Sequence, residues 1–223
     1  MKLSEEGTFD APELSLGLIP EGTSILLTGD DTAAIETIFY LLVGARENER
    51  SLILATETNG RTVNRELDRI EYGASNRSTV LTCSGAAAES NVTTTDDIGD
   101  LTGVGMQFSA LVAESGTMGA SQRAGILLCS SICQEVDDIQ SVFRFLNANF
   151  LTHLRRDEIM GVCAVDTSAD VDGDIDGVIK SMAAAFSAHI SVETTDTEEL
   201  VLQITGDEVG SKSVTVSLPD YPW

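Results

Sequence analysis

Residues 26–37 read LLTGDDTAAIET and join an apolar stretch to a segment with helical spacing. Residues 25–28 form a short apolar run of the kind found in buried strands, and Ile35, Ile38 and Phe39 recur at the intervals of one helix face. A glycine between such a strand and such a helix is the setting of the phosphate-binding loop G-x-x-x-x-G-K-[ST], in which backbone N–H groups and a lysine surround phosphate. The stretch therefore predicts a strand–turn–helix unit and raises the question of nucleotide binding.

Only the first position of that motif is matched in this chain. Gly29 takes the place of the first glycine, whereas Ala34 lies at the second glycine and Ile35 at the lysine. Glu36 replaces the hydroxyl residue that holds Mg²⁺, and Thr37 follows one place too late. The positive charge that would neutralise the β- and γ-phosphates is therefore missing.

Two aspartates add negative charge inside the same turn. Asp30 and Asp31 stand where the phosphates of a nucleotide would lie, so they are expected to repel them. We define the degenerate phosphate loop as Gly29, Asp30, Asp31, Thr32, Ala33, Ala34, Ile35, Glu36 and Thr37.

Strand-like and helix-like segments alternate along the rest of the chain. Periodicity and turn residues predict strands at 25–28, 51–55, 78–82, 125–129, 159–165, 190–193, 200–205 and 214–217, and helices at 32–45, 62–71, 101–113, 136–154 and 174–188. The polar stretch 83–100 is expected to be a surface loop. The alternation predicts one α/β domain over residues 1–223, with a mostly parallel sheet covered by helices on both faces and antiparallel strands at the C-terminal end.

The charge of the chain is strongly negative. The sequence has 36 acidic and 13 basic residues, a net charge of −23, and only three lysines: Lys2, Lys180 and Lys212. Acids spread along the whole chain are typical of proteins from extreme halophiles, in which concentrated salt screens their repulsion. A dedicated cationic partner is the alternative explanation. Either way, direct binding to a nucleic-acid backbone is unfavourable.

The sequence contains no apolar run long enough to cross a bilayer, and its first residues, MKLSEEGTFD, are acidic and unlike a signal peptide. We therefore expect a soluble, cytoplasmic protein.

Five segments, taken in order, resemble KaiC-like and RadA-like members of the RecA superfamily. They are GLIPEGTSILLTGD (17–30), RSLILATETNGRTVNRELDRIEYG (50–73), AGILLCSS (124–131), IMGVCAVDTSAD (159–170) and AAAFSAHISVET (183–194). The resemblance covers nearly the full chain and implies a RecA-like, three-layer α/β/α fold. Any other α/β domain with a Gly-Asp turn is the competing interpretation.

The resemblance also implies where catalytic groups would lie. The Walker B aspartate, which helps to place Mg²⁺, falls at Cys129, followed by Ser130, and the water-activating glutamate is matched by Glu57. Since the lysine, the hydroxyl and the aspartate are all replaced, we expect no catalytic residue, with Glu57 as the one candidate base, and no bound cofactor.

Three functions remain open at this point. The first is a catalytically inactive regulatory or protein-interaction module with a protein partner or in a homo-oligomer. The second is an enzyme that binds ATP and Mg²⁺ and hydrolyses ATP weakly, with Glu57 as its base. The third is a recombinase-like accessory protein in DNA repair, which the acidic composition disfavours.

An acidic stretch near the C-terminal third has part of a calcium-binding pattern. Asp172, Asp174 and Asp176, followed by Gly177, match the start of an EF-hand loop, but its twelfth position is Ala183 rather than a bidentate acid. An acid-rich helix start explains the same residues, so we expect no metal site there.

The remaining candidate residues show no catalytic pattern in the sequence. His153 and His189 lie far apart, and no acid stands at a recognisable spacing from either. The chain ends in Tyr221, Pro222 and Trp223, an apolar end for which docking on the chain's own sheet and docking on a neighbouring subunit or partner are both open.

Overall fold

A mostly parallel sheet, nine-stranded within the described part of the chain, forms the centre of the protein. The computed structural model describes residues 7–87, 89–116, 119–136, 138–170, 175–195, 199–206 and 209–217. Over these ranges the strand order is β11-β10-β9-β3-β8-β7-β4-β5-β6. The strands are β3 (Ser24–Gly29), β4 (Glu49–Ala55), β5 (Ser78–Thr82), β6 (Val92–Thr94), β7 (Ser121–Leu127), β8 (Met160–Asp166), β9 (Ala188–Thr194), β10 (Leu200–Gly206) and β11 (Lys212–Val216).

The strands from β9 to β6 run parallel, whereas β10 and β11 are antiparallel to their neighbours. The prediction of a mostly parallel sheet with C-terminal antiparallel strands is therefore confirmed. A separate antiparallel pair, β1 (Thr8–Asp10) and β2 (Leu18–Pro20), lies near the N-terminus beside a 3₁₀ turn at Pro12–Leu14.

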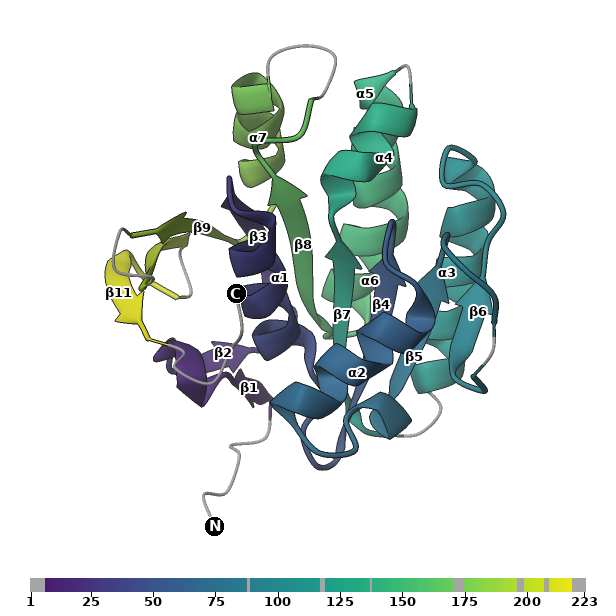
Figure 1. The fold of residues 1–223 in the computed structure, drawn as a ribbon, viewed down its shortest axis with the longest axis horizontal. Coiled ribbons are helices and arrows are strands. Elements are labelled where there is room, and N and C mark those ends of the chain that lie inside the picture. The colour runs from purple at the N-terminus through teal and green to yellow at the C-terminus, as the bar shows by residue number, and fades with distance from the viewer. Residues whose placement is uncertain are drawn as a thin grey trace.

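Helices cover both faces of the sheet and give the predicted three layers. Figure 1 shows α1 and α2 in front of the sheet and α3, α4 and α6 behind it. The helices are α1 (Thr32–Val43), α2 (Gly60–Ile70), α3 (Leu101–Gly116), α4 (Cys129–Glu135), α5 (Ile139–Phe145), α6 (Thr152–Arg156) and α7 (Ile175–Ala183), with a π-helical segment at Leu146–Leu151 and a 3₁₀ turn at Ser75–Arg77.

Each face of the sheet has its own apolar core. On the first face, Ile35, Ile38 and Phe39 of α1 are fully buried together with Val63 and Leu67 of α2. On the other face, helices α3 to α7 bury a second set that includes Phe108, Phe145, Phe150, Leu154 and Met182. The helical spacing seen in the sequence therefore marks the buried stripes correctly.

Several of the predicted elements differ from the structure in their extent. The helix expected over 136–154 begins only at Ile139, because Val136 is extended and Asp138 caps α5 by accepting from the Gln140 N–H; helical structure then continues through the π-helical segment and α6 to Arg156. The loop expected over 83–100 contains β6, which pairs with β5. The strand expected to reach residue 129 ends at Leu127, and Cys129 already begins α4. The helix expected over 174–188 stops at Ala183, and Ala188 begins β9.

Gly125 in β7 gives α1 room to lie against the sheet. A Cβ at this position would come within 2.5 Å of the Phe39 ring and 2.8 Å of a Val43 methyl. Gly125→Ala is therefore expected to lower the free energy of unfolding by about 1–3 kcal/mol, as overpacked cores do. Denaturant melts would measure the loss.

Gly116→Ala is the matched control for Gly125→Ala, because the nearest heavy atom to its added Cβ, outside its own neighbourhood, is 3.5 Å away. It should change stability by less than about 0.5 kcal/mol. Adding Phe39→Leu to Gly125→Ala should restore part of the loss. Equal effects of the two alanine variants would contradict the packing argument.

Among the described helices, none combines the length and hydropathy that crossing a membrane requires.

Candidate functional site

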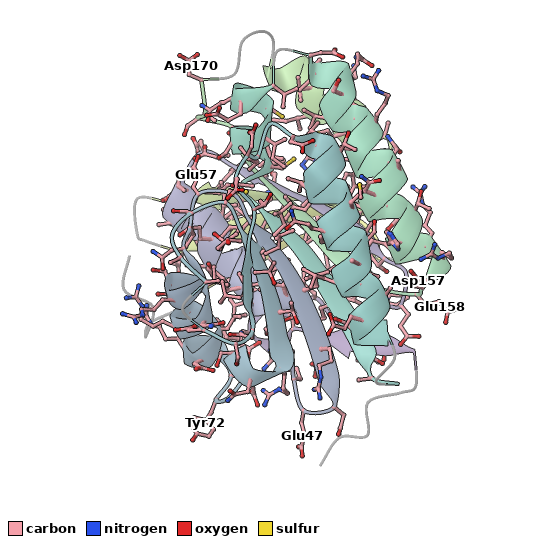
Figure 2. All side chains as sticks on the ribbon, turned by 90° about the vertical axis from the view of Figure 1, so that its right-hand side faces the viewer. Glu47, Glu57, Tyr72, Asp157, Glu158 and Asp170 are labelled. Atoms are coloured by element: carbon pink, nitrogen blue, oxygen red, sulfur yellow. The ribbon has the colours of Figure 1, made fainter. Side chains whose placement is uncertain are left out.

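The carboxyl ends of β3, β4, β7 and β8 meet at one edge of the sheet, where open parallel sheets usually place their ligands. Figure 2 shows Glu57 at this end of the molecule, with Tyr72 and Glu47 at the opposite end. The candidate site consists of the turn between β3 and α1 and of the polar side chains that follow the neighbouring strands.

The turn between β3 and α1 is very short. β3 ends at Gly29 and α1 begins at Thr32, so only Asp30 and Asp31 connect them. Asp31 caps the helix: one carboxylate oxygen accepts from the Ala34 N–H at 3.1 Å, and the other accepts from the Thr194 hydroxyl at 3.0 Å. One of the free N–H groups with which a helix start binds anions is thus already occupied by the protein's own carboxylate.

The remaining residues of the degenerate phosphate loop belong to α1. Ala34 and Ile35 are fully buried in the core, and Thr37 is also buried. Thr32 and Ala33 are exposed in the first turn of the helix. The position at which the resemblance places a lysine therefore faces the apolar core and cannot present a charge to a ligand without leaving it.

Glu36, in the same helical turn, is half-buried. Burial raises the pKa of its carboxyl above the ordinary value, and the charges of Glu66 and Glu57 raise it further. The three carboxyls thus repel one another between α1, α2 and the end of β4.

Asp166 is a site residue that the sequence did not single out. It ends β8 opposite Gly29 and is buried, and its carboxylate accepts from the Thr32 hydroxyl at 2.5 Å. It also accepts from the Ser168 N–H at 2.8 Å and hydroxyl at 2.6 Å, and its own N–H donates to the Ser130 hydroxyl at 3.2 Å. A negative group is thereby fixed beside the start of α1. The available signal was an acid at the end of the apolar run MGVCAV.

The expected Walker B position lies just beyond β7. Leu128 has a positive φ of 58°, which is rare for a branched side chain, and this turn sends the chain from the strand into α4. Cys129 and Ser130 are both buried at the start of that helix. Neither offers a carboxylate that could hold Mg²⁺.

Glu57 follows β4 and is exposed at this edge. Its carboxylate accepts a hydrogen bond from the hydroxyl of Ser131 in α4. The preceding Thr56 hydroxyl donates to the carbonyls of Leu127 at 2.9 Å and Leu128 at 3.0 Å, which fixes the end of β4 against β7. The structure thus brings Glu57 beside the residues that follow Cys129 and Ser130.

A family model described as "Family of unknown function (DUF7504)" matches residues 22–192, well over half of the chain. The chain belongs to DUF7504. The match includes β3, α1 and the strands that carry Glu57, Cys129 and Asp166. No curated protein matches the chain.

Two solved structures resemble this DUF7504 chain. The KaiC-like protein PH0186 from the hyperthermophilic archaeon Pyrococcus horikoshii OT3 aligns with a TM-score of 0.64 at 14% identity, over 96% of this chain and 94% of its own. The uncharacterized protein PH0321 from Pyrococcus horikoshii, solved in complex with an unknown peptide, aligns with a TM-score of 0.64 at 11% identity, over 91% of this chain and 95% of its own. At such identities the likeness establishes the fold, which is KaiC-like and RecA-like.

Across the described ranges of the DUF7504 chain, no group of three or more His, Cys, Asp or Glu side chains is placed to hold a metal ion. The calcium candidates Asp172 and Asp174, and the side chain of Asp176, lie outside the described part of the structure.

One expectation about the histidines of this DUF7504 chain was wrong, because His153 does have a paired acid. Its Nδ1 lies 3.1 Å from Asp157 Oδ2, and its Nε2 lies 3.0 Å from the hydroxyl of Ser109 in α3. Arg156 also reaches Nδ1 at 2.9 Å, and its hydrogen bond is the main cause that lowers the pKa of Asp157 to about 2. Since the backbone N–H groups around Ser109 bond within α3, they cannot form an oxyanion hole. The cluster ties α3 to α6.

Proposed function

We propose that this DUF7504 chain is a catalytically inactive, RecA-like module that acts by binding other proteins. The observation that carries the proposal is the start of α1 only two residues after β3, with Asp31 as its cap and Ile35 in the core. A phosphate loop needs several free backbone N–H groups and a lysine around the phosphates. Here the first turn of α1, which begins at Thr32, occupies the positions that would form that loop.

The charges at the turn also oppose a nucleotide. Asp31 and Asp166 hold two carboxylates at the start of α1. In a partly shielded site with an effective dielectric constant near 20, each pair of like charges about 4 Å apart costs about 4 kcal/mol. The helix start offers only about half a unit of positive charge in return. Repulsion of a triphosphate therefore dominates at moderate salt.

The interaction role has separate support. PH0321, which shares the fold, was solved with a bound peptide, so a chain of this architecture can hold one. The net charge of −23 disfavours a nucleic-acid backbone as the partner, and with it an accessory role in DNA repair. The same charge and the scarcity of lysine support a halophilic host as part of the proposal.

A second candidate function is weak ATP hydrolysis, which one observation favours. Glu57 is exposed at the carboxyl edge beside Ser131, where the resemblance places a water-activating base. This function would need a turn that opens enough to admit the phosphates and Mg²⁺.

Phosphate release and binding of a labelled ATP analogue, measured with Mg²⁺ at 0.2 M and 3 M KCl, distinguish the two functions. We expect neither turnover above background nor saturable binding at either salt concentration. The high-salt arm is needed because screening weakens the repulsion at the turn. Circular dichroism in the same solutions controls for folding.

Turnover that disappears in Glu57→Gln would reject the inactive module in favour of the second function. Saturable binding without turnover would contradict the closed turn. Asp31→Asn with Asp166→Asn is expected to remain without binding, since the buried Ile35 still leaves the turn without a cation.

A further inference from the structure

Three arginines form a stripe along α2. Arg61, Arg65 and Arg69 are spaced four residues apart and so share one face of the helix. The side chains of Arg61 and Arg65 are 81% and 67% exposed, and that of Arg69 is 39% exposed. With a rise of about 1.5 Å per residue, neighbouring members of the stripe are about 6 Å apart along the helix.

The ion pairs of this stripe contribute little to the stability of the fold. Some of the other basic residues serve the structure directly: Arg77 donates to the Ala45 carbonyl at 3.0 Å, and Lys212 donates to the Leu16 carbonyl at 2.8 Å. In the stripe, Arg61 comes only within 3.9 Å of Glu89, and Arg65 and Arg69 share one carboxylate. Exposed pairs of this kind add little to stability.

A groove of about 800 Å³ runs beside the stripe, between α2, the 3₁₀ turn at Ser75–Arg77 and the residues just before β6. Besides the three arginines, it is lined by amides, hydroxyls and two carboxylates: Asn64, Asp68, Ser75, Asn76, Glu89, Ser90 and Asn91. Asp68 already accepts from the Ser75 N–H at 3.0 Å, and Asn64 and Asn91 bond to each other, so the groove is built by fixed contacts.

An exposed aromatic ring stands at one end of the stripe. Tyr72, two residues beyond α2, is 95% exposed, and Figure 2 shows it projecting from the molecule. Tyrosine and arginine are the residue types enriched where proteins bind one another.

We propose that the groove along α2 binds an extended acidic segment of a partner protein, with carboxylates at every second residue. Alternate residues on one side of an extended strand are about 6.7 Å apart, and neighbouring arginines of the stripe are about 6 Å apart along the helix. The long, flexible arginine side chains can adjust to this small difference. Each carboxylate can then meet one guanidinium. This inference names the class of partner for the interaction role proposed above, and it rests on that proposed role.

The lining of the groove favours a peptide over a nucleic acid. Asp68 and Glu89 carry oxygens that accept hydrogen bonds, and a peptide backbone offers N–H donors to them. A phosphate backbone offers only acceptors, so it gives these oxygens no hydrogen bond. A second copy of this chain is disfavoured because both copies carry a net charge of −23.

Labelled synthetic peptides test the inference by fluorescence anisotropy, at the lowest KCl concentration at which circular dichroism shows the native fold. One peptide alternates glutamate with threonine, a second has the same composition with its glutamates contiguous, and a third has glutamine in place of glutamate. The alternating peptide is expected to bind about tenfold more tightly than the contiguous one, and the neutral peptide is not expected to bind.

The triple variant Arg61→Gln, Arg65→Gln, Arg69→Gln is expected to lose this binding and keep its fold. Its matched control is Arg144→Gln, Arg155→Gln, Lys180→Gln, which makes the same change in net charge on three exposed residues of α5, α6 and α7. The control should bind the alternating peptide as the unchanged chain does.

Four results would overturn the inference: no binding of the alternating peptide, equal losses in the two triple variants, tighter stripe-dependent binding of a single-stranded oligonucleotide, or self-association in sedimentation that disappears in the stripe variant. The peptide result does not involve the turn between β3 and α1. ATP turnover there would therefore reject the inactive module while leaving the acidic-peptide result to stand separately.

Discussion

Arg123→Met is expected to lower the free energy of unfolding by about 3–5 kcal/mol. Arg123 lies in β7 with a completely buried side chain, and its guanidinium donates to both oxygens of Glu49, at 2.7 and 3.0 Å. It also donates to the carbonyls of Leu42 at 2.7 Å and Asp10 at 3.0 Å, and it lies over the ring of Phe9. The variant would remove the counter-charge of the largely buried Glu49, which would keep the backbone N–H of Arg46 as a hydrogen-bond donor, and would remove the donation from Arg123 to two carbonyls; this accounts for the size of the loss.

Denaturant melts of Arg123→Met and Arg144→Met make the comparison. Arg144 is a matched control because its contact with Asp138 is exposed, so its loss should be below about 1 kcal/mol. Adding Glu49→Leu to Arg123→Met should recover part of the stability, since the unpaired charge is removed. A loss no larger than that of Arg144→Met would show that Arg123 does not hold these segments together.

Dilution from 2 M KCl into 10 mM buffer is expected to unfold the protein. The Debye length grows from about 2–3 Å to about 30 Å, so the repulsion that belongs to a net charge of −23 is no longer screened. The structure shows how few cations oppose this repulsion. A single arginine, Arg46, lies within 4 Å of carboxylates on three residues: Asp10, Glu13 and Glu71. Far-UV circular dichroism would follow the loss, and a spectrum unchanged by dilution would contradict the expectation.

The pH dependence of the free energy of unfolding at low salt provides a control, because its direction can be predicted. Because the pKa of Glu36 is raised in the folded protein, its contribution to stability is fully present below the ordinary value of 4.5 and is lost as the pH rises through the folded pKa. Mild acidification toward this range should therefore offset part of the destabilisation by dilution.

The unit of β3, its turn and α1 could be predicted from the sequence because its signal is local. Apolar spacing marks the strand and the helix, and Gly29 marks the end of the strand. β6 was missed because it has only three residues, Val92–Thr94, too few to show an alternating pattern. The start of α5 was placed three residues too early because the apolar stripe already begins at Val136, although a capping aspartate, Asp138, was present.

The candidate site could be predicted only in part, since it is assembled across the sheet. Motif positions identified Gly29, Glu57 and Cys129 one at a time along the chain. They gave no indication that Asp166 lies opposite Gly29 and accepts from Thr32, because that pairing depends on the order of β3 and β8 in the sheet. The stripe on α2 is visible as a spacing of four residues, whereas its groove also needs residues that precede β6.

The position of β3 has a consequence for biosynthesis. This strand is made before both of its neighbours in the sheet, β8 and β9. Its two edges are closed by pairing such as that of Leu26 with Cys163 on one side and with His189 on the other, residues 137 and 163 positions further along the chain. On the ribosome, both edges of β3 therefore stay unpaired, with the apolar residues Ile25, Leu26 and Leu27 exposed, until most of the chain has emerged. The nascent chain is expected to be the state most exposed to aggregation, and its own dense negative charge, which keeps neighbouring chains apart, would protect it during that interval.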